Sequence, residues 1–348
     1  MPWLETDGGS PDLRGMQGIL ARAGASDDSL VPLLAQLELQ LAADPAGAAE
    51  LVRAARALLL DRPRLLAELF RALHELPARR PAHYCYAPPV EESARIDSVV
   101  ATLQRDGIAR WPGMYSERLL GELEQLTVQA LARSKAFMRS GADDSRSVWP
   151  DPELGCEHWG TRSSRNGRTR SFFRSDAATR AGVERQLMGD PRIFEIGARY
   201  YAAAISAHGL LLEMLEPASD TLPWHVDGIL DQFKAMILLA DVEICHGPME
   251  YRRGTQRQLA ARALWPALHG TFASGRAWSS LGDSVVQQVP GVNELVTGRR
   301  GDVIFFDTLG IHRGGMPSAD ARLVAVGYFG ASTRWNAFAQ QVRGDANL

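Results

Sequence analysis

Three residues in the C-terminal half of the chain have the side-chain types and the order of a metal site: His225, Asp227 and His312. On a β-strand, His225 and Asp227 point to the same side, because successive residues alternate between the two faces. His312 follows Asp227 by 85 residues, and a histidine from a neighbouring strand completes three ligands on one face of a metal. Two histidines and one carboxylate leave three coordination positions open, which suits non-haem Fe(II). Structural zinc instead fills its coordination sphere with protein ligands, usually including Cys.

Apolar segments rich in β-forming residues surround these ligand candidates and predict the strands that position them. They are residues 210–215, 233–239, 303–306 and 323–329. A His-x-Asp pair alone is weak evidence, because the number of such pairs expected by chance in a chain of this composition is about 0.5. The order of strand, pair, second His and a following Arg favours metal ligands over polar residues that only stabilise the fold.

A longer set of motifs resembles one enzyme family. It comprises Trp224-His225-Val226-Asp227, the run from Phe233 to Val242, Gly247-Pro248-Met249, Gly254-Thr255, Gly301-Asp302, His312-Arg313-Gly314-Gly315 and Arg322. These motifs are similar to those of the phytanoyl-CoA dioxygenase-like family of Fe(II)/2-oxoglutarate-dependent oxygenases, over about residues 90 to 335. The resemblance implies a mainly β fold with flanking helices. Its centre is a double-stranded β-helix, a jelly-roll or cupin-like barrel of two facing sheets that holds the metal at its open end.

The resemblance also implies roles for single residues. His225, Asp227 and His312 bind Fe(II), and Arg322 holds the distal carboxylate of the co-substrate 2-oxoglutarate, which reacts with O2. The position of Met236 lies beside this oxo-acid. No catalytic residue beyond the metal ligands is implied.

One departure from the family pattern concerns Arg322. The family often has a hydroxyl residue two positions after the distal His, where this chain has Gly314, so Arg322 needs another helper. Lys234 is either that helper or a substrate contact, because it shares a strand face with Met236 and so points into the barrel. A buried ammonium needs a partner, which Glu213 or a bound carboxylate would supply. The alternative is a Lys that extends to the barrel rim.

Asp227 bears on the type of reaction. Relatives that halogenate carry a small residue at this position, so an intact Asp favours hydroxylation of an unactivated C–H bond, with release of succinate and CO2. Desaturation, cyclisation and epimerisation branch from the same chemistry and stay open. Three rival classes are a non-haem iron enzyme that does not use 2-oxoglutarate, a metal hydrolase and a non-catalytic binding module. The expected substrate is a small metabolite, either amino-acid-like or a natural-product intermediate.

The composition agrees with a soluble enzyme. A chain of 348 residues with 45% hydrophobic residues can bury a barrel core and a smaller second unit. The formal net charge of −3, without long basic runs, argues against nucleic acid as a partner. Three widely spaced Cys residues suit a reducing cytosol, and no apolar run reaches the ~18 residues of a membrane span. We therefore expect a cytoplasmic protein that does not bind membranes.

Two units are expected along the chain. Residues 1–80 form a helical N-terminal extension with Leu-rich stripes, and residues 88–348 form the oxygenase domain. The extension packs on the barrel, forms a homodimer interface or docks a carrier protein. An insertion at residues 256–299 is expected to be a loop-rich cover of the substrate pocket.

Residues 140–176 are predicted to be a long irregular segment, either a lid that closes over substrate or a solvated surface loop. Its Arg170 and Arg174 are candidate substrate contacts, together with Glu213 and Trp224. Packing is the alternative role of Trp224, because a residue next to a ligand faces away from the metal on a regular strand.

Overall fold

Two antiparallel β-sheets and a layer of helices make up the described part of the chain. The structure, a computed structural model, describes residues 86–139, 148–160, 167–175, 182–217, 222–228, 230–257, 279–333, 335–336 and 339. The strands are β1 (Ile108–Trp111), β2 (Val148–Asp151), β3 (Cys156–Trp159), β4 (Arg168–Arg174), β5 (Ile205–Leu215), β6 (His225–Val226), β7 (Gln232–Leu238), β8 (Met249–Arg253), β9 (Ser279–Ser280), β10 (Val292–Val296), β11 (Val303–Asp307), β12 (His312–Arg313) and β13 (Arg322–Ala331). The helices are α5 (Val90–Asp106), α6 (Glu117–Arg139), α7 (Val183–Met188), α8 (Pro191–Tyr201), α10 (Asp283–Gln288) and the 3-10 helix η2 (Ile244–His246).

The chain alternates between the two sheets over its C-terminal half. The larger sheet has the strand order β1-β11-β7-β13-β5-β4-β3-β2, and the smaller sheet has the order β10-β8-β12-β6-β9. From β5 onward, β5, β7, β11 and β13 belong to the larger sheet, while β6, β8, β9, β10 and β12 belong to the smaller one, so the chain changes sheet at every step except from β8 through β9 to β10. This alternation brings β6 and β12 side by side although they are far apart in the sequence.

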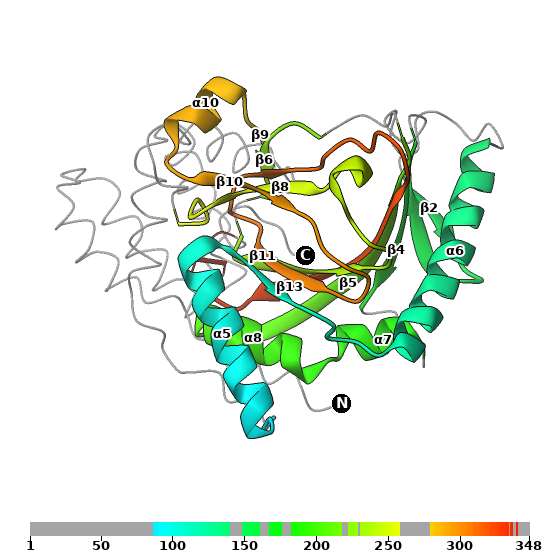
Figure 1. Ribbon diagram of the computed structural model, residues 1–348. Coiled ribbons are helices and arrows are strands. Elements are labelled where there is room, and N and C mark those ends of the chain that lie inside the picture. Colours follow the sequence, from blue (N-terminus) through cyan, green and yellow to red (C-terminus); the bar gives the residue numbers. More distant parts are fainter. Residues whose placement is uncertain are drawn as a thin grey trace, which may run out of the picture.

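Helices α5, α6, α7 and α8 cover the face of the larger sheet that is turned away from the smaller sheet (Figure 1). Local signals set their ends. Ser116 precedes α6 and its hydroxyl accepts from the Leu119 N–H at 3.4 Å, whereas Asp190 caps α8 and is followed by Pro191 at the first helical position. Gly107 ends α5 at a φ of 77°, in the left-handed region that glycine adopts readily.

Strand alternation separates two hydrophobic cores on the two faces of the larger sheet. On β7, Phe233 and Ala235 pack in the core beneath the helices, whereas Met236 and Leu238 pack in the core between the two sheets. Strands β8 and β10 supply the opposite wall of this second core. Lys234 has the parity of Met236 and therefore lies on the inner face, between the sheets, as the sequence predicts.

The predicted strands are confirmed as β5, β7, β11 and β13. The prediction of an irregular segment at 140–176 is wrong, because its described residues include β2, β3 and β4, which extend the larger sheet beyond β5. Arginines at alternate positions hid strand β4 in the sequence. Arg168 and Arg170 lie on its inner face, near the carboxylate of Glu213.

Several predicted segments lie outside the described residues. These are the N-terminal extension at 1–80 and residues 258–278 of the insertion at 256–299. The described remainder of the insertion contains β9, α10 and β10. Among the helices that the structure does describe, none is both long and apolar enough to cross a membrane.

Phe329 on β13 tests the core that joins the larger sheet to the helices. Its buried ring packs on Phe233 and Phe194, with centroid separations of 5.2 and 5.8 Å. Because Phe329→Ala removes this burial and leaves a cavity, we expect it to lower the free energy of unfolding by about 3–5 kcal/mol in urea titrations. The control is Val292→Ala, at a strand position 60% exposed. A Phe329→Ala loss no larger than that of the control would contradict this packing.

Candidate metal centre

Pairing of β12 with β6 places His312 opposite His225. The centroids of the two imidazole rings are 4.3 Å apart. Asp227 follows β6, and its carboxylate lies 3.5 Å from each ring, with Oδ1 near Nε2 of His225 and Oδ2 near Nε2 of His312. The potential ligand atoms of the three residues all lie within 4.8 Å of one another. The structure therefore brings the three sequence-predicted ligands together.

Both imidazoles present a lone pair to this group. Nδ1 of His225 lies 2.8 Å from the Pro223 carbonyl, and Nδ1 of His312 lies 2.8 Å from the Gly310 carbonyl. Because a carbonyl only accepts, each Nδ1 carries the proton and each Nε2 carries the lone pair that a metal needs. Burial lowers the pKa of His312, which keeps this ring neutral near pH 7. Two lone pairs and a carboxylate repel one another unless a cation lies among them, so the arrangement fits a divalent metal.

Lys234 on β7 supplies one positive charge to the same group. Its Nζ donates a short hydrogen bond to Oδ2 of Asp227 and lies 4.4 Å from the ring centroid of Tyr328. Burial alone would raise the pKa of the Asp227 carboxyl, but the charge of Lys234 holds it well below its usual range. Although burial acts to lower the pKa of Lys234, the Asp227 carboxylate raises it overall. The partner of Lys234 is therefore Asp227, and not Glu213, which the sequence offered as one of two alternatives.

A turn after β11 accepts hydrogen bonds from two of the ligand candidates. The Thr308 carbonyl accepts from the Asp227 N–H at 2.9 Å, and the Gly310 carbonyl accepts from Nδ1 of His312 at 2.8 Å. Tyr251 of β8 donates from its hydroxyl to the Asp307 carbonyl at 3.0 Å. The turn therefore fixes the backbone of one ligand and the ring of another through groups that do not reach the metal position.

A cluster of charged side chains lies deeper on the inner face of the larger sheet. Arg168 contacts Glu213 through two hydrogen bonds, Nε to Oε2 at 2.9 Å and Nη2 to Oε1 at 3.3 Å. Nη2 of Arg322 lies 3.8 Å from the same carboxylate, and Nη1 donates to the Gly247 carbonyl. Burial would raise the pKa of Glu213, but the charges of Arg168, Arg170 and Arg322 lower it to about 2. The cluster holds three positive charges and one negative charge.

The other sequence-predicted residues differ in their placement. Met236 lies in the core between the sheets. Trp224 is buried, with the guanidinium of Arg313 4.4 Å from its ring centroid, which favours packing over substrate contact. Arg174 is exposed, and its Nε donates to Glu157 at 2.8 Å. This surface pairing favours a structural role for Arg174.

Sequence reasoning missed two contributors to the site. Arg168 was hidden in a segment predicted to be irregular, although Arg168-Thr169-Arg170-Ser171 has the two-residue alternation of a strand. Asp307 stands five residues before a ligand candidate, and nothing in the sequence indicates that its carboxylate supports the turn.

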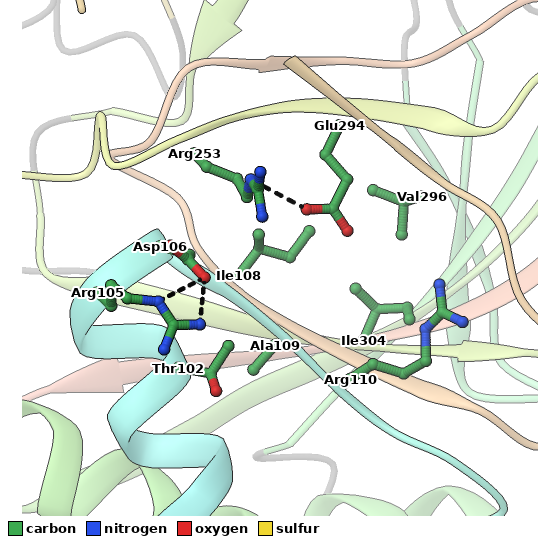
Figure 2. Close-up of a pocket in the computed structure, with 10 residues that line it drawn as sticks. All are labelled: Thr102, Arg105, Asp106, Ile108, Ala109, Arg110, Arg253, Glu294, Val296 and Ile304. Atoms are coloured by element: carbon green, nitrogen blue, oxygen red, sulfur yellow. Dashed lines mark hydrogen bonds and ion pairs between the residues drawn. The ribbon is translucent and has the colours of Figure 1, made fainter. Parts of the chain in front are cut away.

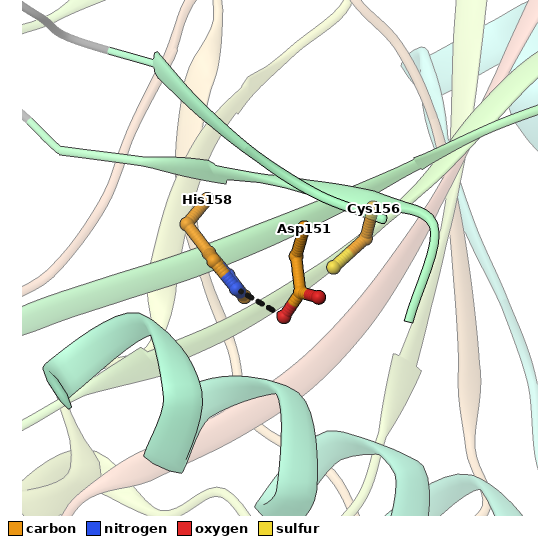
Figure 3. A group of neighbouring side chains, drawn as sticks. All are labelled: Asp151, Cys156 and His158. Carbon is orange, nitrogen blue, oxygen red and sulfur yellow. Dashed lines mark hydrogen bonds and ion pairs between the residues drawn. The ribbon is translucent and has the colours of Figure 1, made fainter. Parts of the chain in front are cut away.

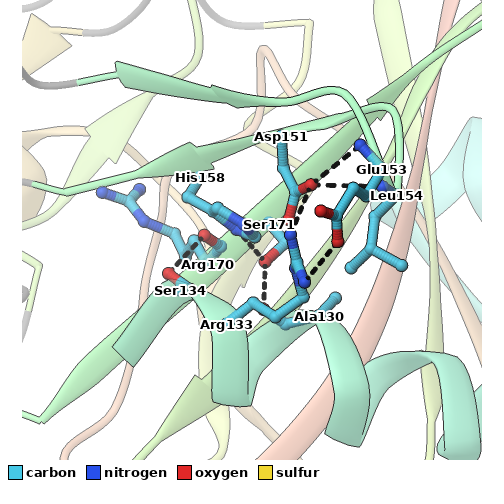
Figure 4. A network of polar contacts seen from close by, with 9 residues as sticks. All are labelled: Ala130, Arg133, Ser134, Asp151, Glu153, Leu154, His158, Arg170 and Ser171. Carbon is cyan, nitrogen blue, oxygen red and sulfur yellow. Dashed lines mark hydrogen bonds and ion pairs between the residues drawn. The ribbon is translucent and has the colours of Figure 1, made fainter. Parts of the chain in front are cut away.

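A second group of potential ligands consists of Asp151, Cys156 and His158 (Figure 3). The oxygens of Asp151 already accept from Nε and Nη2 of Arg133, and Oδ2 lies 3.1 Å from Nε2 of His158 (Figure 4). Nδ1 of His158 lies 2.9 Å from the Ser171 hydroxyl, so Ser171, His158 and Asp151 have the order of a catalytic triad. Their full burial against α6 denies access to a substrate, and the group joins this helix to β2, β3 and β4.

A cavity of about 210 Å³ lies at the end of α5, between β1, β8 and β10 (Figure 2). Its charged side chains are paired: Arg105 with Asp106 at 2.6 Å, Arg253 with Glu294 at 3.4 Å, and Arg110 with Asp302, outside the lining, at 3.9 Å. Its lining includes no member of the candidate metal centre. We therefore assign the chemistry to the metal centre and not to this cavity.

Comparisons with known proteins give no family assignment. No family model matches the sequence, and no curated protein matches it. Similar solved structures include the epimerase SnoN in complex with Fe3+, alpha ketoglutarate and nogalamycin RO (16% identity, 69% of this chain and 85% of that chain, TM-score 0.49). Others are EctD from S. alaskensis with 2-oxoglutarate and 5-hydroxyectoine (17%, 73% and 82%, 0.48) and the carbocyclase SnoK from nogalamycin biosynthesis (17%, 71% and 88%, 0.47). At this identity and with TM-scores below 0.5, the assignment of the site rests on its own geometry.

Asp307 gives a pH-dependent test of the turn. Its Oδ1 accepts from the Leu309 N–H at 2.8 Å, and its Oδ2 accepts from the hydroxyls of Tyr200 and Tyr201 at 2.8 and 3.2 Å. Burial raises the pKa of Asp307 to about 7, although these donors act in the opposite direction. In the unfolded chain the carboxyl ionises near pH ~4. Between these pH values Asp307 is protonated in the folded protein and ionised in the unfolded chain. The contribution of this group to the free energy of unfolding therefore falls as the pH rises.

The variant Asp307→Asn keeps a neutral side chain at every pH. We expect its free energy of unfolding, relative to the parent, to increase from about pH 4 to pH 7 by at most ~4 kcal/mol. Urea titrations of both proteins across this range measure the difference. A difference that does not change with pH would show that the buried carboxyl titrates normally.

Proposed function

We propose that the protein is an Fe(II)- and 2-oxoglutarate-dependent oxygenase that hydroxylates an unactivated C–H bond of a small metabolite. One observation carries the proposal: two imidazole lone pairs and one carboxylate, from His225, His312 and Asp227, converge within 4.8 Å. Such a set leaves coordination positions for an oxo-acid and O2. Within the described residues, no Cys belongs to this group, which argues against structural zinc.

The strand order supports a finer assignment of the fold. One sheet contains β11-β7-β13-β5 and the other contains β10-β8-β12-β6. The chain alternates between them except from β8 to β10, which lie in the same sheet, as in a double-stranded β-helix. We propose this fold, within the phytanoyl-CoA dioxygenase-like family, for a catalytic domain at residues 88–348. For residues 1–80 we propose an extension that packs on this domain, with a homodimer or carrier-protein contact as the alternative.

The proposal assigns a role to the metal ligands and to the two basic residues near them. Bound Fe(II), with 2-oxoglutarate and O2, supplies the oxidation that releases succinate and CO2 and replaces a C–H bond by C–OH. His225 and His312 keep their orientation because each Nδ1–H is held by a carbonyl. Lys234 orients the carboxylate of Asp227. Arg322, buried and with its Nε lacking an acceptor, binds the distal carboxylate of the oxo-acid.

The inner face of the larger sheet also supports a small, acidic substrate. The Nε of Arg170 is buried and has no hydrogen-bond partner, so this guanidinium can receive an anionic group. Trp159 stacks on Phe172 at 4.6 Å, and Phe172 meets the edge of Tyr328 at 5.7 Å. These rings form a wall that leads from Lys234 toward Arg170. An amino-acid-like metabolite or an acidic natural-product intermediate fits this surface.

Anaerobic titration with Fe(II) and 2-oxoglutarate tests the proposal through the weak visible charge-transfer band of the chelate. The parent is expected to form the band. We expect Arg322→Ala to need about 10- to 100-fold more 2-oxoglutarate, because it loses a charge-assisted contact to the distal carboxylate. The exposed Arg174 provides the control, and Arg174→Ala is expected to bind the oxo-acid like the parent.

Succinate release completes this test. The parent is expected to form succinate only in the presence of O2, and Asp227→Ala is expected to form none because it loses a metal ligand. Bound iron without the band would instead favour an iron enzyme that does not use 2-oxoglutarate. Turnover of substrate without O2 would favour a metal hydrolase.

A further inference from the structure

Gly314 lies between two buried guanidinium groups, two residues after the ligand candidate His312. A Cβ built on Gly314 would lie 3.7 Å from Nη2 of Arg168 and 3.8 Å from Nη2 of Arg322. The two arginines come from β4 and β13, which flank β5, and both pair in register with Leu215. Each is only 5% exposed. Two cations that share a small space in the interior need anionic partners.

The protein itself does not supply enough acceptors for this pair. Glu213 accepts two hydrogen bonds from Arg168, whereas the nearest nitrogen of Arg322 is 3.8 Å from it, beyond hydrogen-bond length. Arg322 donates to the Gly247 carbonyl, and its buried Nε has no acceptor. A guanidinium has five N–H donors, and most of those of Arg322 have no hydrogen-bond acceptor among the described residues. The described cluster therefore lacks an acceptor beside Gly314.

We propose that Arg168 is the second residue that holds the distal carboxylate of the oxo-acid, together with Arg322. This proposal rests on the function proposed above. In it, the fork of Arg168 takes the place of the hydroxyl side chain that is missing at Gly314, and the absence of a side chain there leaves room for the carboxylate. Glu213 orients Arg168 and offsets part of the positive charge.

A purely structural ion pair is the competing explanation for Arg168, because a bidentate contact with Glu213 would also join β4 to β5. The two explanations differ in their dependence on the ligand. A structural role affects every oxo-acid equally, since all of them chelate the metal through the same end. A contact to the distal carboxylate affects 2-oxoglutarate and leaves 2-oxobutyrate, which has no distal carboxylate, unchanged.

The experiment measures the Kd of both oxo-acids for the Fe(II)-loaded protein by anaerobic titration of the charge-transfer band. The variants are Arg168→Met and the double variant Arg168→Met, Glu213→Leu, which avoids an unpaired buried carboxylate. For both, we expect the Kd of 2-oxoglutarate to rise about 10- to 100-fold and that of 2-oxobutyrate to stay unchanged. The matched control is Arg174→Met, which removes the exposed Arg174–Glu157 pair from the same strand and should change neither Kd.

The outcomes separate this proposal from the function on which it rests. Equal weakening of both oxo-acids in the Arg168 variants, or no change for either, would overturn the role of Arg168. If the parent prefers 2-oxoglutarate and only Arg322→Ala abolishes the preference, the proposed function stands without Arg168. If the parent binds both oxo-acids with the same Kd, or binds neither, the distal-carboxylate site and the role of Arg168 both fail.

Discussion

The pairing of β12 with β6 is the constraint on which the candidate site depends. A shift of this register by one residue would turn an imidazole to the opposite face of the smaller sheet and separate the ligands. Contacts on the other side of β12 oppose such a shift. His312 also pairs with Tyr251 of β8, and the Ile311 N–H donates to the Thr255 hydroxyl at 2.8 Å. These contacts use protein groups alone, so the ligand positions are set before a metal binds.

Charged side chains on the inner face of the larger sheet cost free energy to bury. This cost indicates that the face binds a ligand. Lys234 is paired with Asp227 and Arg168 with Glu213. Arg170 and Arg322 also lie near Glu213, whose single negative charge cannot balance three guanidinium groups. Replacing buried ion pairs by apolar side chains is often neutral or stabilising. A barrel selected only for stability would therefore carry apolar residues here. The excess of guanidinium groups instead fits a pocket that receives carboxylates.

Much of this arrangement could be predicted from the sequence, because the β-rich runs and the His-x-Asp pair depend on local alternation. The ligand set, the four central strands and the inward direction of Lys234 follow from that alternation. The partner of Lys234 could not be predicted, because Asp227 and Glu213 both precede it in the chain, by 7 and 21 residues, and only the fold selects between them. Strand β4 was missed because its arginines resemble a solvated surface until Glu213 and Arg322 are placed beside it. Residues 1–80 and 258–278 lie outside the described part, and their predictions remain predictions.

A crystal structure of the protein grown anaerobically with Mn(II) and 2-oxoglutarate tests the central claim most directly, because anomalous scattering at the manganese edge locates the metal. The account predicts one manganese bound by Nε2 of His225, Nε2 of His312 and the carboxylate of Asp227, with the oxo-acid chelated to it. Manganese bound at Asp151 and His158 instead, or no manganese between the two histidines, would contradict the account.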